Sequence, residues 1–296
     1  MKMTDHSAWR RVLAEQFAEG YRGLPGVRAV LLAGSVARGF ADRYSDIELT
    51  VFWNGPPPER LRRHAAEAGG GIMVQAHSFD PDNDEWADDI TLSGVEIQAS
   101  HRTVDGTERW LADVVTGFDP DLAKQDLIAL IRSGVPVHDA DLVRSWQERT
   151  EVYPRKLAIA MVRAHLDFRS AWQRRKLLDR RELLPLYTDL VDSARNIVLV
   201  LFGLNYRYFP HLGFKWLPHD IAALTSTPAN LTTRLNTTFT ASPQDAVRAI
   251  DSLIEETLTL AGASLPEAGA NEELTLFRQT RPVWDGSPLD QPTQVI

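Results

Sequence analysis

The sequence contains no cysteine in its 296 residues. This absence excludes disulfides, thiolate metal sites and a cysteine nucleophile. No stretch approaches the roughly 18–20 consecutive apolar residues of a membrane-spanning helix, and the N-terminal segment lacks the apolar core of a secretory signal. The histidines show no metal-ligand spacing, and the chain has no internal repeat. We therefore expect a cytoplasmic protein without a membrane partner.

Charge and hydrophobicity narrow the class of protein further. Hydrophobic residues make up 44% of the chain, which is enough for a buried core, and the formal net charge is −8. An acidic balance argues against broad nucleic-acid binding and suits a cationic small substrate or a basic partner. The N-terminal segment is expected to form an amphipathic helix whose inner face carries Trp9, Val12, Leu13 and Phe17.

Short apolar segments rich in β-branched residues dominate the first part of the chain. They predict four strands, at residues 27–33, 46–53, 72–78 and 94–102. From about residue 119 the apolar spacing becomes helical, and strand signals nearly vanish. The sequence therefore predicts an α+β protein with three parts: a mixed-sheet domain over residues 1–118, a helical bundle over 119–265 and a loose extension over 266–296.

The strand predicted at residues 46–53 begins with two carboxylates in an otherwise apolar segment. Because side chains alternate across a strand, Asp46 and Glu48 lie on one face, about 7 Å apart along the strand. Like charges this close repel each other unless a cation lies between them. Mg²⁺ takes oxygen ligands and is often shared with substrate phosphates. We therefore predict that the two carboxylates bind Mg²⁺; a solvated edge strand is the alternative.

A Gly-Ser pair ends the preceding strand. Gly34 allows the backbone to approach a ligand closely, and Ser35 offers a hydroxyl and a free N–H at the start of a short helical turn. Such a terminus can bind phosphate. Phosphate donors beside metal-binding carboxylates predict a site for a nucleoside triphosphate. For the Gly-Ser pair alone, a simple turn is the alternative.

The segment GSVARGFADRYSDIEL, which begins at Gly34, resembles the signature of the DNA-polymerase-β-type nucleotidyltransferase superfamily. The resemblance implies that Asp46 and Glu48 hold two Mg²⁺ ions and that Gly34 and Ser35 bind nucleotide phosphates. It also implies a third acidic residue on a later strand, which Glu96 matches, as general base or as a further metal ligand. Many members have aspartate where this chain has Glu48, and the longer side chain requires different metal distances. An exposed strand glutamate is the alternative for Glu96.

The layout is similar to the small-molecule branch of that superfamily, the antibiotic-resistance enzymes that transfer AMP to hydroxyls of aminoglycosides or lincosamides. In this branch Lys215 would match a triphosphate contact, with a surface lysine as the alternative. Asp192 shares a helix face with Asp189 and Asn196 and is expected to contact the substrate, with a solvated face as the alternative. The acidic segment 79–89 resembles a calcium loop only superficially, and we expect a solvated loop there.

The sequence therefore predicts a Mg²⁺-dependent nucleotidyltransferase. It would move AMP, from ATP or another nucleoside triphosphate, to a hydroxyl of a small cationic acceptor such as an aminoglycoside. Two alternatives stay open: a toxin-system-type enzyme that modifies protein or RNA, and a non-catalytic relative that only binds nucleotide. The sequence alone names neither the acceptor nor the nucleotide.

Overall fold

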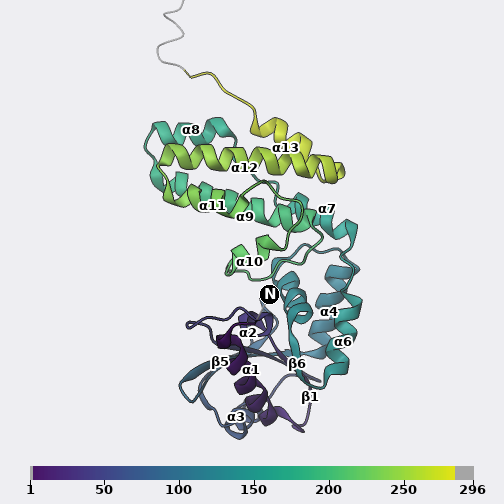
Figure 1. Ribbon diagram of the computed structural model, residues 1–296. Coiled ribbons are helices and arrows are strands. Elements are labelled where there is room, and N and C mark those ends of the chain that lie inside the picture. The colour runs from purple at the N-terminus through teal and green to yellow at the C-terminus, as the bar shows by residue number, and fades with distance from the viewer. Residues whose placement is uncertain (1–2, 284–296) are drawn as a thin grey trace, which may run out of the picture. The chain divides into compact units, whose positions relative to one another are not determined.

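The computed structural model describes residues 3–283 (Figure 1). Contacts group the chain into two compact units. The first comprises the chain up to Leu157 together with Tyr206–Lys215, and the second comprises Ala158–Asn205 together with the chain from Trp216 onward. Among the described residues, no helix combines the length and the apolar character that crossing a membrane requires.

A six-stranded mixed sheet forms the frame of the first unit, with the strand order β3-β4-β5-β2-β1-β6. Strands β2 and β5 pair in parallel, and the other neighbours pair antiparallel. The strands are β1 (Val27–Leu32), β2 (Ile47–Trp53), β3 (Ile72–Ala76), β4 (Trp86–Leu92), β5 (Val95–Thr103) and β6 (Val135–His138). This sheet, with helices around it and a helical unit after it, confirms the predicted α+β class.

Two of these strands are absent from the sequence prediction. Strand β4 begins in the acidic segment that we expected to be a solvated loop, yet its Asp88 is buried, ion-paired with Arg62 and hydrogen-bonded to His101. Strand β6 contains Pro136 and pairs with β1 at the end of the sheet. Proline, which has no backbone N–H, is tolerated at such an edge because no further strand requires a hydrogen-bond donor there.

Helices cover both faces of the sheet in the first unit (Figure 1). On one face, Phe17 and Ala65 of two helices pack in a common core with Leu49 of β2. On the other face, the ring of Trp146 lies 4.8 Å from that of Phe52 in an edge-on arrangement. The helices of this unit are α1 (Asp5–Ala18), η1 (Glu19–Tyr21), α2 (Gly34–Arg38), α3 (Glu59–Ala68), α4 (Val104–Val115), α5 (Leu122–Ser133) and α6 (Ala140–Arg149).

The inner face of α1 differs from the prediction. Trp9 and Val12 are 42% and 53% exposed, whereas Phe17 is fully buried as expected. The buried face includes Ser7 instead, whose hydroxyl accepts a hydrogen bond from the N–H of Ala41 at 2.9 Å. Apolar spacing alone does not reveal this polar contact with the chain before β2.

The second unit is helical. Within it, α12 packs against α8, α9, α11 and α13 (Figure 1). Its helices are α8 (Ala171–Asp179), α9 (Leu183–Leu204), α10 (Leu217–Ala222), α11 (Leu231–Thr240), α12 (Pro243–Ser264), η2 (Pro266–Ala268) and α13 (Ala270–Phe277). Helix α7 (Arg155–Ala164) begins in the first unit and continues into the second.

The compact units do not divide at residue 118, where the sequence placed a domain boundary. Helix α5 packs on α2 and α4, and α6 and β6 pack on β1, so these elements belong with the sheet. The loose extension expected from residue 266 is not loose as far as Phe277, because α13 packs on α12 and Phe277 is buried. The last part of that extension, residues 284–296, lies outside the described residues.

Candidate nucleotide and metal site

The turn after β1 brings the backbone against a predicted metal ligand. Gly34 has a φ of +62°, a left-handed conformation that glycine adopts at little cost. A β-carbon on Gly34 would lie 2.5 Å from the carboxylate carbon of Glu48. Any larger residue would therefore strain the backbone and displace that carboxylate. Gly34 is the point at which the Gly-Ser pair and the acidic strand meet.

The carboxylate of Glu48 has a perturbed pKa. Burial raises its pKa to about 7, and the nearby carboxylates of Asp46 and Asp126 also raise it, while the charges of Lys215 and Arg38 lower it. Within the part of the chain that the structure describes, neither Asp46 nor Glu48 forms an ion pair. Two neighbouring carboxylates in this state favour binding of a cation.

The register of the sheet places Glu96 on the same face as this pair. In the parallel pairing of β2 with β5, Glu48 lies opposite Gln98. Because side chains alternate, Glu96 shares the face of Gln98, one step further toward Asp46. Glu96 is exposed, and it lies opposite Thr91 of β4. The predicted acidic residues thus lie on one face of two neighbouring strands, and the role of Glu96 stays a prediction.

The chemistry of Asp46 and Glu48 fits Mg²⁺. Both donors are carboxylates, and the pKa of Glu48 is raised first by burial and then by the charge of Asp46 beside it. Mg²⁺ usually binds one or two carboxylates and takes its other ligands from water and substrate phosphates. Within the described residues, no group of three His, Asp or Glu side chains could hold a metal ion without other ligands. A Mg²⁺ ion at these two carboxylates would therefore need further oxygen ligands.

The ten-residue segment Tyr206–Lys215, which we name the strap, belongs by its contacts to the first unit. It follows α9 and precedes α10 in the sequence. The N–H of His211 donates a hydrogen bond to Oδ1 of Asp126 in α5, at 2.7 Å. Lys215 ends the strap, and its charge lowers the pKa of Glu48. The structure thus brings Lys215 into the electrostatic environment of the acidic strand.

Asp126 and Arg38 are absent from the predicted site although both act on the pKa of Glu48. Arg38 lies in the sequence between Ser35 and Asp46. A cation in that position is a signal from which its place in the site could have been predicted. Asp126 lies in α5, and helical spacing does not distinguish it from any other polar residue of that helix. Its position beside the site depends on tertiary contacts alone.

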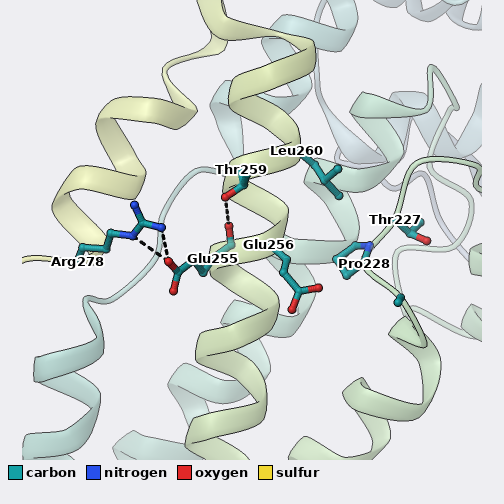
Figure 2. A pocket seen from close by; sticks show the side chains of 8 residues that line it. Thr227, Pro228, Glu255, Glu256, Thr259, Leu260 and Arg278 are labelled. Atoms are coloured by element: carbon teal, nitrogen blue, oxygen red, sulfur yellow. Dashed lines mark hydrogen bonds and ion pairs between the residues drawn. The ribbon is translucent and has the colours of Figure 1, made fainter.

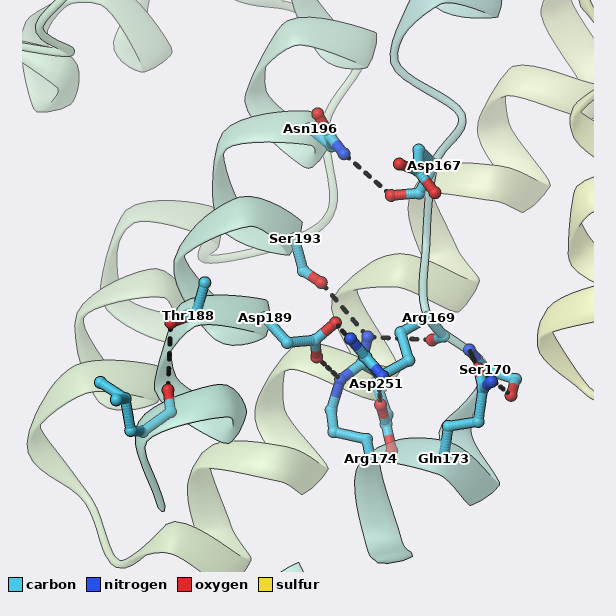
Figure 3. Close-up of polar contacts among 11 residues, drawn as sticks. Asp167, Arg169, Ser170, Gln173, Arg174, Thr188, Asp189, Ser193, Asn196 and Asp251 are labelled. Atoms are coloured by element: carbon cyan, nitrogen blue, oxygen red, sulfur yellow. Dashed lines mark hydrogen bonds and ion pairs between the residues drawn. The ribbon is translucent and has the colours of Figure 1, made fainter. Parts of the chain in front are cut away.

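The helix face predicted to contact substrate is not uniform. Asp189 is buried and ion-paired with the buried Arg174 (Figure 3). Asn196 donates to the backbone carbonyl of Asp167 at 2.8 Å. Asp192 is exposed. Asp189 and Asn196 therefore stabilise the second unit, and a substrate contact by Asp192 stays a prediction.

The expected solvated loop at residues 79–89 is wrong, because three of its six carboxylates are paired with arginine. The ion pairs are Asp84 with Arg109, Glu85 with Arg102 and Asp88 with Arg62. Asp80 accepts from the N–H of Asp82 at 2.9 Å and so stabilises the turn. The segment also lines a cavity of about 460 Å³. The arginine partners reduce the attraction of this segment for a cationic ligand.

A second cavity, of about 510 Å³, lies in the second unit (Figure 2). Its acidic residues are already paired: Arg278 contacts Glu255, and Arg234 contacts Glu256. Its lining consists of Thr227, Pro228, Ala229, Glu255, Glu256, Thr259, Leu260 and Arg278. Unlike the environment of Glu48, this cavity holds no carboxylate that lacks a cationic partner.

A family model described as "Domain of unknown function (DUF4037)" matches residues 121–217, a segment that includes Asp126 and the strap. No curated protein matches the chain. A nucleotidyltransferase-like protein from Exiguobacterium sibiricum 255-15 is similar in structure, with 12% identity over 90% of this chain and 80% of that chain and a TM-score of 0.41. The CdnC:HORMA-deltaN complex of E. coli MS115-1 gives 15% identity, 93% and 91% coverage and a TM-score of 0.29. Cid1 in complex with its short product ApU gives 15% identity, 43% and 41% coverage and a TM-score of 0.26.

Proposed function

We propose that this chain is a Mg²⁺-dependent nucleotidyltransferase that moves AMP from ATP to a hydroxyl of an acceptor. The observation that carries the proposal is the carboxylate of Glu48, which lies against Gly34 and beside Asp46 with its pKa raised to about 7. Burying a carboxylate without a partner costs stability. Perturbed carboxylates of this kind are typical of functional sites, and the motif that holds this one resembles a nucleotidyltransferase signature.

The nucleotide would be held through its phosphates. Ser35 is buried next to Gly34, and its hydroxyl and the neighbouring backbone are proposed to bind the β- and γ-phosphates. Lys215 is proposed to contact the same phosphates, which its influence on the pKa of Glu48 supports. Phosphate oxygens pair well with such cations and hydrogen-bond donors.

The chemistry follows from the positions of the carboxylates. Asp46 and Glu48 would hold Mg²⁺, which when bound polarises the α-phosphate and stabilises the leaving pyrophosphate. Glu96, on the same face of the sheet, would accept the proton of the acceptor hydroxyl. The hydroxyl oxygen bonds to the α-phosphorus while the bond from that phosphorus to the β-phosphate oxygen breaks. The protein contributes mainly by positioning the two substrates.

For the acceptor we propose a small cationic molecule such as an aminoglycoside. The net charge of −8 and the exposed Asp192 support this choice. The arginine partners of Asp84 and Glu85 weaken any attraction of residues 79–89 for such a cation. Hydrogen bonds between carboxylates and ammonium groups are worth about 1.5–3 kcal/mol each.

The test is ATP-dependent release of pyrophosphate with a panel of acceptors. We expect aminoglycosides to stimulate release more than neutral lincosamides or nucleosides, with an effect that shrinks as salt rises. Stimulation by tRNA or by a protein instead would keep the reaction and change the acceptor class. Absence of release together with absence of Mg²⁺-dependent ATP binding in calorimetry would contradict the proposed function.

Glu96→Gln tests the proton acceptor. We expect the rate of transfer to fall by roughly 10²–10⁴-fold, the usual contribution of a general base, with little change in ATP affinity. Steady-state kinetics and calorimetric titration with ATP measure the two quantities separately. If affinity falls together with rate, Glu96 is a metal ligand.

A further inference from the structure

The strap has an unusual backbone. Ten non-glycine residues among those described have a positive φ, and four of them lie in the strap or directly after it: Tyr206, His211, Phe214 and Trp216. Such conformations cost free energy and persist only where surrounding contacts impose them, which is common at functional sites. The contacts that hold the strap therefore determine where Lys215 lies.

Aromatic contacts hold the first half of the strap. Tyr208 and Phe209 are buried. The ring of Tyr153 lies 4.8 Å from that of Tyr208 and 6.2 Å from that of Tyr206. Arg155 also donates a hydrogen bond to the hydroxyl of Tyr206 at 3.3 Å. These contacts fix the strap on the first unit well before Lys215.

A buried carboxylate holds the second half. The N–H of His211 donates to Asp126 at 2.7 Å, and the N–H of Phe214 donates to the carbonyl of His211 at 2.8 Å. The second bond closes a turn, and Lys215 follows this turn directly. Because the turn links His211 to the residue before Lys215, the bond from Asp126 fixes the end of the strap.

Asp126 is an unfavourable residue for a site that binds a triphosphate. Its negative charge acts on Glu48 and would also repel an incoming polyphosphate. Burial disfavours its charged form and raises its pKa. The hydrogen bond from the N–H of His211 stabilises the carboxylate of Asp126 in this place.

We propose that Asp126 is a positioning residue, which holds the strap through the backbone of His211 so that Lys215 meets the β- and γ-phosphates of the nucleotide. The inference rests on the proposed function and deepens it. Asp126 would not touch the nucleotide. Its contribution would lie in nucleotide affinity and not in the chemical step.

Two substitutions separate the hydrogen bond of Asp126 from its charge. Asp126→Asn keeps an acceptor oxygen for the N–H of His211 but removes the charge, whereas Asp126→Ala removes both. We expect Asp126→Ala to raise the KM for ATP about tenfold, the value of one hydrogen bond to a charged acceptor, with kcat nearly unchanged. Asp126→Asn should stay within about twofold of the wild type. Asp141→Ala, at an exposed carboxylate of α6, is the matched control.

Lys215→Ala should weaken binding of ATP but not of AMP, because AMP lacks the β- and γ-phosphates. If Asp126 acts through Lys215, the double variant Asp126→Ala/Lys215→Ala should bind ATP no more weakly than Lys215→Ala alone. Additive losses would overturn the proposal. So would equal increases in KM for the Asn and Ala variants, because the Asn variant keeps an acceptor for the N–H of His211.

Hydrogen exchange gives a readout that does not depend on activity. Without nucleotide, amides of the strap should exchange faster in Asp126→Ala than in Asp126→Asn or the wild type. Unchanged exchange in the Ala variant would overturn the inference, while Mg²⁺-dependent ATP binding by the wild type would still support the proposed function. If the wild type binds no ATP, the proposed function and the role of Lys215 both fail, and the exchange data still show whether Asp126 anchors the strap.

Discussion

Carboxylates lie close together in both compact units, but their charges are balanced differently. In the second unit, Asp189 and Asp251 both contact the guanidinium of Arg174, which is fully buried (Figure 3). In the first unit, Asp46 and Glu48 share a strand face, and within the described part of the chain neither has an ion-pair partner. A buried cation of the chain contacts both carboxylates of the first arrangement, whereas the second arrangement has no such contact among the residues that the structure describes.

The two pairs of carboxylates differ in whether a cation of the chain contacts them directly. A buried carboxylate is tolerated when a cation and hydrogen bonds satisfy it. Arg174 does this for Asp189, and it also donates to Ser193 at 3.2 Å. At Glu48 the cations Lys215 and Arg38 only partly offset burial, and the pKa stays raised. The unbalanced pair is therefore the better candidate for a ligand site.

Asp46→Asn should have the largest effect on activity. Removing one carboxylate of the unbalanced pair should lower Mg²⁺-dependent turnover by about 10³-fold or more, since metal stabilisation of charge is worth several kcal/mol. The fold should stay intact because no ion pair is lost, which circular dichroism checks. Asp141→Asn serves as an exposed control. Wild-type turnover in Asp46→Asn would show that the site is elsewhere.

Arg174→Leu tests the balanced site. The substitution leaves Asp189 and Asp251 without their buried cation, and losing one partner of a buried pair costs about 3–5 kcal/mol. Chemical denaturation measures the free energy of unfolding. Arg144→Ala, which breaks an exposed pair with Asp141, should cost less than about 1 kcal/mol. A similar cost for both variants would contradict the structural role of Arg174.

Glu48→Gln should stabilise the protein in the absence of metal, in a manner that depends on pH. The folded-state pKa of about 7 lies above the ordinary 4.5. The protonated form therefore stabilises the fold at low pH, and this contribution is lost as pH rises through 7. Each pKa unit corresponds to about 1.4 kcal/mol, so glutamine should raise the free energy of unfolding by about 3 kcal/mol at pH 8 and by clearly less at pH 5.

The measurement for Glu48→Gln is denaturant unfolding in EDTA at both pH values. Glu96→Gln is the control, because Glu96 is exposed on the same sheet face. If Glu48→Gln stabilises the protein no more at pH 8 than at pH 5, the pKa of Glu48 is not raised in the folded protein.

Asp192→Asn should have the smallest effect of these substitutions. It allows two aspartates of α9 to be compared. Asp192 is exposed, whereas Asp189 on the same helix is buried in the balanced site. We expect Asp192→Asn to raise the KM of a cationic acceptor about threefold, because an exposed ion pair is worth less than about 1 kcal/mol, with the KM for ATP unchanged. Asp189→Asn should lower stability instead. An unchanged acceptor KM would remove Asp192 from the proposed site.

The parts of the site that could be predicted from the sequence are local. Gly34, Asp46 and Glu48 lie within one strand, turn and strand, so alternation alone places the carboxylates together. Glu96 could be placed on a polar face because β5 alternates cleanly, and the register with β2 agrees with that placement. These inferences need only the geometry of neighbouring residues.

The parts that could not be predicted depend on partners far away in the sequence. An aspartate such as Asp88 favours a loop. It is tolerated in β4 because Arg62 of α3 pairs with its charge and His101 of β5 forms a hydrogen bond with it. Asp126 is one polar residue of a regular helix until the N–H of His211 reaches it. Periodicity carries no information about such contacts, so β4 and the strap anchor were both missed.

The position of the strap in the chain also bears on how the protein is made. Asp126 and His211 are 85 residues apart, and α9 is synthesised between them. A ribosome therefore releases the whole sheet before it releases the segment that completes the first unit. During that interval the buried carboxylate of Asp126 lacks its partner in the strap, and closing so long a loop carries an entropic cost. The first unit should mature late, and a nascent chain that ends at Leu157 should lack the lysine proposed to bind nucleotide.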